Sequence, residues 1–209
     1  MYIFSASLQA KPGRGGELGA RMIPLRDAIT EATGNQAYAW AASSGPPIGA
    51  FGISTRATGH EHLIELQQKM GASESYHAEA AKLADVLAMP STTSLSQIVA
   101  MAGEQGEPAP VVRLTQATVQ IGHVGDAMNW GQEMLQHVHN TTGLSGLFTN
   151  LASGSPFDVM WIFSANTGAE LDAANAALQA DTGYIGLIDK AASFIVPGSA
   201  ARATLVQMT

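Results

Sequence analysis

Histidine is the first residue type to weigh for chemistry, because imidazole is both a common metal ligand and an acid–base group near neutral pH. His60 and His62 form the sequence HEH, and His137 and His139 form HVH, so both pairs are spaced i, i+2. On a helix this spacing points the two rings in different directions, whereas helical zinc sites use i, i+3 or i, i+4. We therefore expect no metal site and assign these histidines to solvent or to helix caps.

Tyr76 and His77 are the candidate catalytic residues. They are neighbours in the stretch SESYHAEAAKLADVL, which has helical periodicity and ends before Pro90. Tyrosine and histidine are both side chains that transfer protons to or from a bound substrate. The alternative is that Tyr76 packs beneath its helix while His77 points to water.

The sequence contains an internal repeat, which indicates the structural elements that carry these candidate residues. The stretch Thr33–Thr55, TGNQAYAWAASSGPPIGAFGIST, returns as Thr142–Ser164, TGLSGLFTNLASGSPFDVMWIFS, at a spacing of 109 residues. Ser5–Ala10 matches Gln116–Ile121 at a spacing of 111. Such matches in constant order indicate duplication followed by divergence.

A segment of different composition separates the two copies. Met101–Val112, MAGEQGEPAPVV, is rich in Gly, Glu and Pro, which disfavour helix and strand and are typical of an exposed linker. We therefore predict a first domain at residues 1–100, a linker at 101–112 and a second domain at 113–209.

Both copies show the same succession of hydrophobic periods. Each opens with period-two alternation, YIFSASLQ or TQATVQI, which predicts a strand. A helical pattern follows and ends at Gly34 in the first copy and Gly143 in the second, where glycine suits a left-handed C-cap. Pro24 lies inside the first of these helical patterns and should kink or break the helix.

The later part of each copy predicts a hairpin, a second helical region and a closing strand. Ser, Gly and Pro residues separate two apolar runs of strand length, as in a hairpin. Thr58 and Thr167 then stand three residues before a glutamate, which predicts a capping box at the start of a helix. The order is strand, helix, strand, strand, helix, strand, repeated once. We predict an α+β fold of two tandem ferredoxin-like βαββαβ repeats whose antiparallel sheets pack into an intramolecular dimeric α/β barrel.

This order, with a broken second helix that ends near Pro90 or Pro197, resembles the dimeric α/β-barrel superfamily in tandem form. The resemblance covers almost the whole chain and rests on element order rather than on a catalytic motif. The superfamily includes antibiotic-biosynthesis monooxygenases, EthD-like and NIPSNAP-like proteins, haem-degrading enzymes, chlorite dismutases and muconolactone isomerases. The resemblance implies that the helix with His77 lies over a ligand cavity, where this histidine would be the residue to ligate haem.

Aromatic residues are the candidates for ligand binding. Tyr76 recurs as Tyr184 at a spacing of 108, and retention in both copies favours a structural role. Trp40 and Trp161 are each present in one copy only, since Thr149 stands in place of Trp40 and Gly52 in place of Trp161 at the spacing of 109. This exchange either repacks the core or lines one asymmetric pocket, formed by Trp40, Trp161 and Tyr184, for a small hydrophobic molecule.

Composition excludes several classes of function. The chain has no cysteine, so thiolate chemistry is absent, and a net charge of −7 offers no basic face for nucleic acid. No apolar run reaches the length of a membrane helix, and we expect a cytoplasmic protein without a signal peptide. Only 13% of the residues are charged, which indicates either a surface covered by further subunits in a homo-oligomer or a surface rich in Ser, Gln, Asn and Thr.

Three functions remain open. The first is a cofactor-independent monooxygenase, isomerase or cyclase that acts on a hydrophobic or aromatic substrate, as the resemblance implies. The second is a ligand-binding or assembly protein without catalysis. The third is haem binding through His77. The catalytic reading predicts a pocket with a titratable group in one half of the chain only.

Overall fold

The computed structural model describes all 209 residues, which form two compact units. The first unit comprises Met1–Ser96 and Val206–Thr209, and the second comprises Gln97–Leu205. The C-terminal residues join the first unit through the Met208 backbone, whose N–H donates to the Ala39 carbonyl at 2.9 Å. None of the helices has both the length and the apolar character needed to cross a bilayer.

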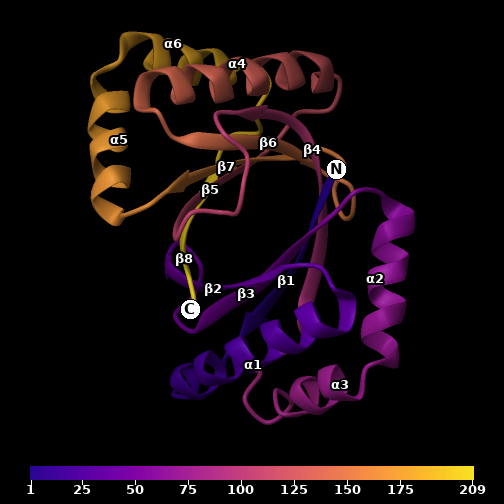
Figure 1. The fold of residues 1–209 in the computed structure, drawn as a ribbon. Coiled ribbons are helices and arrows are strands. Elements are labelled where there is room, and N and C mark those ends of the chain that lie inside the picture. Colours follow the sequence, from indigo (N-terminus) through magenta and orange to yellow (C-terminus); the bar gives the residue numbers. More distant parts are fainter. The chain divides into compact units, whose positions relative to one another are not determined.

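Within each unit the helices cover one face of an antiparallel sheet (Figure 1). The elements that begin in the first unit are β1 (Tyr2–Gln9), α1 (Gly15–Thr33), β2 (Ala37–Ser44), β3 (Ala50–Ala57), α2 (His60–Ala72), α3 (Glu74–Ala81) and β4 (Thr92–Ala102). The second unit repeats this order with β5 (Val111–Thr118), α4 (Val124–Thr142), β6 (Ser145–Leu151), β7 (Asp158–Ala165), α5 (Gly168–Ala180), α6 (Thr182–Ala191) and β8 (Ala201–Gln207).

The strand order matches the predicted fold class. The hydrogen-bonded order is β1-β3-β2-β8-β5-β7-β6-β4, closed on itself as in an α/β barrel. Strands β4 and β8 each contribute residues to both units, because the unit boundaries fall at Ser96 and Leu205. The α+β class with two ferredoxin-like βαββαβ units is therefore confirmed. Between β4 and β5, residues 103–110 form neither helix nor strand, while Met101 and Val112 lie within the flanking strands.

Matching hydrogen bonds correct the register of the repeat. Ala10 N–H donates to the Gly49 carbonyl in the first unit, and Val119 N–H donates to the Phe157 carbonyl in the second. Strands β1 and β5 therefore correspond at a spacing of 109, not the predicted 111, and β3 and β7 correspond at 108. The structural counterpart of Trp161 is accordingly Ile53.

The predicted helix ends are partly correct. Gly34 and Gly143 both adopt the left-handed conformation at their C-caps, with φ of 70° and 74°. Helix α1 continues through Pro24, so the predicted break is absent. Thr167 caps α5 by accepting a hydrogen bond from the Glu170 N–H at 3.1 Å. The capping box predicted at Thr58 is wrong, because Gly59 is the N-cap of α2.

The main core of each unit lies between its first long helix and its sheet, and the two cores differ by a reciprocal exchange. Met22 of α1 and Ala39 of β2 are both fully buried in the first unit. Their counterparts in the second unit, at a spacing of 109, are Gly131 of α4 and Phe148 of β6. A Cβ atom at Gly131 would lie 2.1 Å from Cζ of Phe148, so glycine is required for the ring to fit beneath the helix.

Candidate functional site

A cavity of about 140 Å³ lies within the second unit, between its helices and the strands β5, β7 and β8. Aromatic side chains form much of its wall, from Trp130 on α4, Trp161 and Phe163 on β7 and Tyr184 on α6. Aliphatic side chains of α4 and α5, among them Met134 and Leu178, complete the apolar lining. Such a lining suits an apolar ligand.

The two tryptophans of this wall are held by hydrogen bonds to helix backbone. Trp130 Nε1 donates to the Leu187 carbonyl at 2.8 Å, and Trp161 Nε1 donates to the Gly131 carbonyl at 2.9 Å. The two rings meet edge to face with centroids 5.0 Å apart. Because both indole N–H groups are paired within the protein, the faces that the rings present to the cavity are apolar.

Polar side chains line one edge of the cavity, where Arg113 is the cross-strand neighbour of Phe163. Arg113 of β5 donates a hydrogen bond from Nη1 to Oδ1 of Asn175 on α5. Arg202 of β8 donates from Nη2 to the Tyr184 hydroxyl oxygen at 3.2 Å. All four of these residues line the cavity, so two cationic groups border an otherwise largely apolar wall.

The electrostatic environment of this edge is unfavourable for two cations. Burial lowers the pKa of Arg113 below its usual value, and the positive charge of Arg202 lowers it further. The exposed carboxylate of Asp172 acts in the opposite direction but forms no ion pair with either arginine. The cavity therefore contains two neighbouring guanidinium groups without a carboxylate partner.

Tyr184 is positioned by the start of helix α6. Oδ1 of Asp181, the N-cap residue, accepts a hydrogen bond from the Tyr184 N–H at 2.6 Å and lies 2.8 Å from Nε2 of His137 on α4. These interactions lower the pKa of Asp181, the largest contribution coming from the Tyr184 N–H. A charged Asp181 therefore ties the tyrosine's backbone to α4.

The corresponding region of the first unit is filled by apolar side chains. Phe4 of β1 and the buried Leu66 of α2 pack with Leu95 of β4 in one cluster. At the spacings set by the strand and helix hydrogen bonds, Phe4 corresponds to Arg113 and Leu66 to Ala174. The cavity of the second unit therefore has a polar side chain, Arg113, and a small one, Ala174, where the first unit has two large apolar side chains.

The structure brings together two of the five site residues predicted from the sequence, Trp161 and Tyr184. Trp40 does not line this cavity; it lies in the first unit, where its Nε1 donates to the Ser54 hydroxyl at 2.9 Å. The exchange that paired Trp161 with Gly52 is wrong, because Gly52 and Trp161 occupy opposite faces of their strands.

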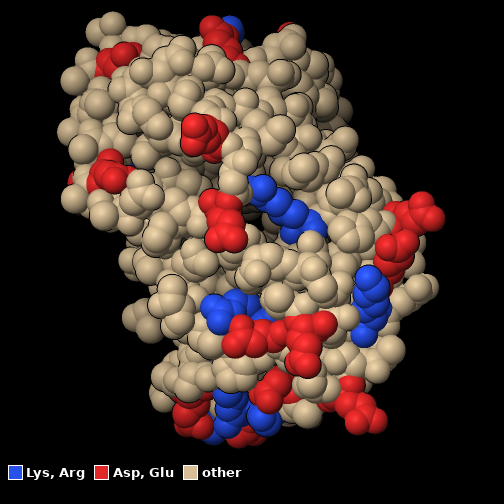
Figure 2. Space-filling view, viewed as in Figure 1, with Lys and Arg blue, Asp and Glu red and all other residues tan.

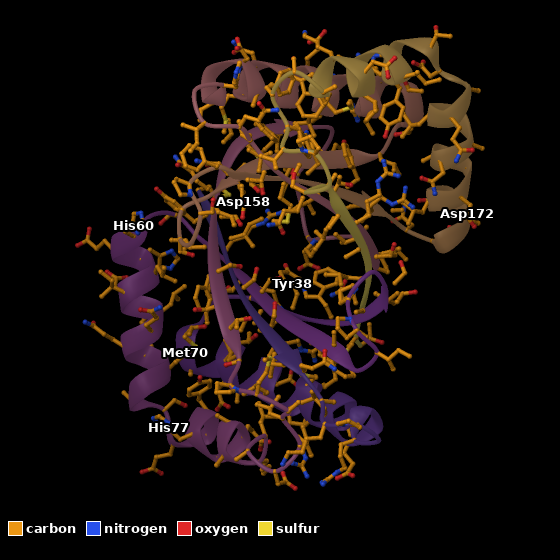
Figure 3. The ribbon with its side chains drawn as sticks, turned by 180° about the vertical axis from the view of Figure 1, so that it is seen from behind. Tyr38, His60, Met70, His77, Asp158 and Asp172 are labelled. Carbon is orange, nitrogen blue, oxygen red and sulfur yellow. The ribbon has the colours of Figure 1, made fainter.

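The other two predicted residues lie on helix α3 of the first unit. Tyr76 packs partly buried against the core, and the exposed His77 has Nε2 2.8 Å from the Gly71 carbonyl. Figure 3 shows His77 beside the end of α2 opposite His60. This arrangement matches the helix-packing alternative for Tyr76 and places neither side chain at the cavity of the second unit.

Sequence reasoning missed the polar edge formed by Arg113, Arg202 and Asn175. One signal was available, since residues 113–209 contain only three lysine or arginine residues, and two of these are Arg113 and Arg202. Charged residues are few on the surface as well, because most of the face shown in Figure 2 is uncharged.

No protein-family model matches the sequence, and no curated protein sequence matches it either. Solved structures do match. A candidate monooxygenase from Fusobacterium nucleatum superposes with a TM-score of 0.73 at 8% identity, over 100% of this chain and 92% of the other. An anthrone oxidase-like protein gives a TM-score of 0.68 at 11% identity, over 100% and 91% of the two chains.

A third structure names the fold itself. A ferredoxin-fold protein from Listeria monocytogenes, related to antibiotic biosynthesis monooxygenases, superposes with a TM-score of 0.54 at 10% identity, over 100% of this chain and 96% of the other. The chain has the fold of these monooxygenase-related proteins. At such low identity the likeness establishes the fold, and the activity has to be argued from the cavity.

Proposed function

We propose that this protein binds a small, mainly apolar molecule in the cavity of the second unit. The observation that supports this most directly is the aromatic wall of Trp130, Trp161 and Phe163 around a cavity of about 140 Å³. An apolar cavity of about 150 Å³ holds one benzene ring, so the enclosed part of the ligand has the size of a single ring.

The counterpart position in the first unit supplies a variant that tests this proposal. Ala174→Leu installs at the cavity the side chain that Leu66 provides in the filled region of the first unit. A matched control is Ala177→Leu, which adds the same side chain on the exposed side of α5.

Toluene is a suitable probe, and its binding is measured as a rise in melting temperature. A ligand at ten times its Kd stabilises the folded state by about 1.4 kcal/mol. For a chain of this length that corresponds to a rise of about 3–6 °C. We expect this rise for the wild type and Ala177→Leu and its loss in Ala174→Leu.

Two results would contradict the proposal. One is a wild-type melting temperature that toluene does not change. The other is an equal rise in Ala174→Leu, provided that the variant melts cooperatively without ligand. Ala174→Val, which fills less of the space, should give an intermediate rise and serves if the leucine variant does not fold.

A second candidate function, cofactor-independent oxidation of the bound molecule, is favoured by the position of Tyr184. Its hydroxyl oxygen accepts a hydrogen bond from Arg202, which leaves the O–H proton free to donate to an oxygen atom of a ligand. Monooxygenase-related structures share the fold, which supports the same reading. We expect dioxygen uptake above the uncatalysed rate when a single-ring hydroquinone is added, and loss of this uptake in Tyr184→Phe while toluene binding is kept. An oxygen electrode trace at the background rate would remove this candidate and leave the binding function in place.

A further inference from the structure

The cavity edge concentrates positive charge in an otherwise acidic part of the chain. Residues 113–209 contain seven acidic side chains against three basic ones, and two of the three are Arg113 and Arg202. The third, Lys190, pairs with Glu133 at 2.9 Å on the surface. Arg14 at the N-cap of helix α1, and Arg21 and Arg26 within this helix, also pair with carboxylates. Arg113 and Arg202 thus differ from these cations in having no acidic partner.

Bringing two guanidinium groups together at a partly buried edge is costly unless an anion compensates them. The depressed pKa of Arg113 reflects both burial and the charge of Arg202. Asp172 is the carboxylate whose charge acts favourably on Arg113, and Figure 3 shows it on α5. Because Asp172 is exposed and forms no ion pair with either arginine, it compensates them only partly.

The hydrogen-bonding capacity of the edge is also incompletely used. A guanidinium group carries five N–H donors. Within the protein, Arg113 donates to Asn175 and Arg202 donates to Tyr184. The remaining donors of both arginines, together with the Tyr184 O–H, suit a planar acceptor with two oxygen atoms. A carboxylate has this geometry and binds guanidinium groups through paired hydrogen bonds.

We propose that the natural ligand is a single-ring aromatic carboxylate. Its ring lies among Trp130, Trp161 and Phe163, and its carboxylate lies between Arg113 and Arg202. This inference rests on the proposed binding function and adds the size and charge of the ligand. The size follows from the cavity volume, and the charge follows from the two arginines without acidic partners.

Three probes that share one ring and differ in polarity test this assignment: benzoate, benzyl alcohol and toluene. Titration calorimetry at low ionic strength and neutral pH gives the Kd of each. Hydrogen bonds between charged groups are stronger than neutral ones, so we expect benzoate to bind at least about tenfold more tightly than benzyl alcohol.

Variants locate the source of that preference. Arg202→Gln and Arg113→Gln should each weaken benzoate binding by about tenfold and leave the affinity for benzyl alcohol nearly unchanged. Lys190→Gln removes one positive charge from the same unit outside the cavity and should change neither affinity. Arg202 is the safer substitution, because its side chain is more exposed than that of Arg113.

The outcomes separate this inference from the proposed function. If toluene and benzyl alcohol bind but benzoate binds no more tightly, the carboxylate assignment is overturned and the binding function stands. Equal benzoate affinity in the wild type and Arg202→Gln overturns the assignment as well. If none of the three probes binds, the proposed function itself fails.

Discussion

The contact between helix α4 and strand β6 allows a sharp test of how the cavity wall is built. In Gly131→Ala the added Cβ atom would lie 2.1 Å from Cζ of Phe148, far inside van der Waals contact. Phe148 is fully buried and stacks on Trp161 with ring centroids 5.0 Å apart. The ring therefore cannot move without displacing a residue of the cavity wall.

The magnitude follows from two opposing contributions. Replacing glycine by alanine inside a helix favours the helix by about 1 kcal/mol. Overpacking a close-packed core costs about 1–3 kcal/mol. The free energy of unfolding of Gly131→Ala should therefore range from nearly unchanged to about 2 kcal/mol lower. Gly186→Ala on α6 is the matched control, since a Cβ atom there meets nothing within 4 Å and only the stabilising contribution applies.

Thermal unfolding followed by circular dichroism measures the difference. The two variants should differ by about 1–3 kcal/mol, which for a chain of this length is a gap of about 2–12 °C in melting temperature. Gly131→Ala combined with Phe148→Leu should recover part of the loss, because the smaller side chain makes room for the methyl group. The reasoning is refuted if Gly131→Ala melts at or above the temperature of Gly186→Ala.

Two further predictions concern helix starts. The pKa of Asp181 is lowered from its ordinary value of 3.8, so its contribution to stability is present above that pH and is lost as the pH falls through the lowered value. Asp181→Asn should therefore melt below the wild type at pH 6, and the gap should narrow as the pH falls below 4; a gap independent of pH would contradict the assignment. Thr167→Ala should cost about 0.5–2 kcal/mol in urea unfolding because it removes a capping bond. Thr58→Ala should cost less, and equal losses would mean that Thr58 also acts as a cap.

The order of elements was predictable from the sequence because its signals are local. Hydrophobic periods distinguish strands from helices, and Gly34 and Gly143 mark the two long helix ends by their left-handed conformation. Thr58 shows the limit of such signals. The same motif that caps α5 at Thr167 does not cap α2, where the helix begins one residue later, after Gly59.

Register was harder to predict, because a strand has a period of two and a slip of one residue reverses every side chain. The repeated stretch aligns correctly through β2 and β6, where Trp40 corresponds to Thr149. The hairpin of the second unit is one residue shorter, so the same spacing fails in the next strand. That slip paired Trp161 with Gly52 instead of Ile53.

The polar edge of the cavity depends on tertiary structure. Arg113 and Arg202 are 89 positions apart in the sequence, and their meeting requires β5 and β8 to be neighbours in the sheet. Neither arginine belongs to a motif. Only the small number of lysine and arginine residues in the second half of the chain distinguishes them. That small number does not predict that the two side chains lie at the same cavity.

Comparison of the two units indicates that the cavity is a feature in its own right and not a by-product of core repacking. The exchange of Met22 and Ala39 for Gly131 and Phe148 places the larger side chain on the strand instead of the helix. The summed side-chain volume of the two positions is nearly unchanged. The replacement of Leu66 by Ala174 instead leaves an open volume, although Trp161 stands in place of the smaller Ile53 in the same wall. A region that needed only to pack would also gain nothing from a charged side chain such as Arg113, because a partly buried charge is costly. Lost volume and added charge at one place are therefore best explained by a ligand that supplies both the missing apolar contact and the opposite charge.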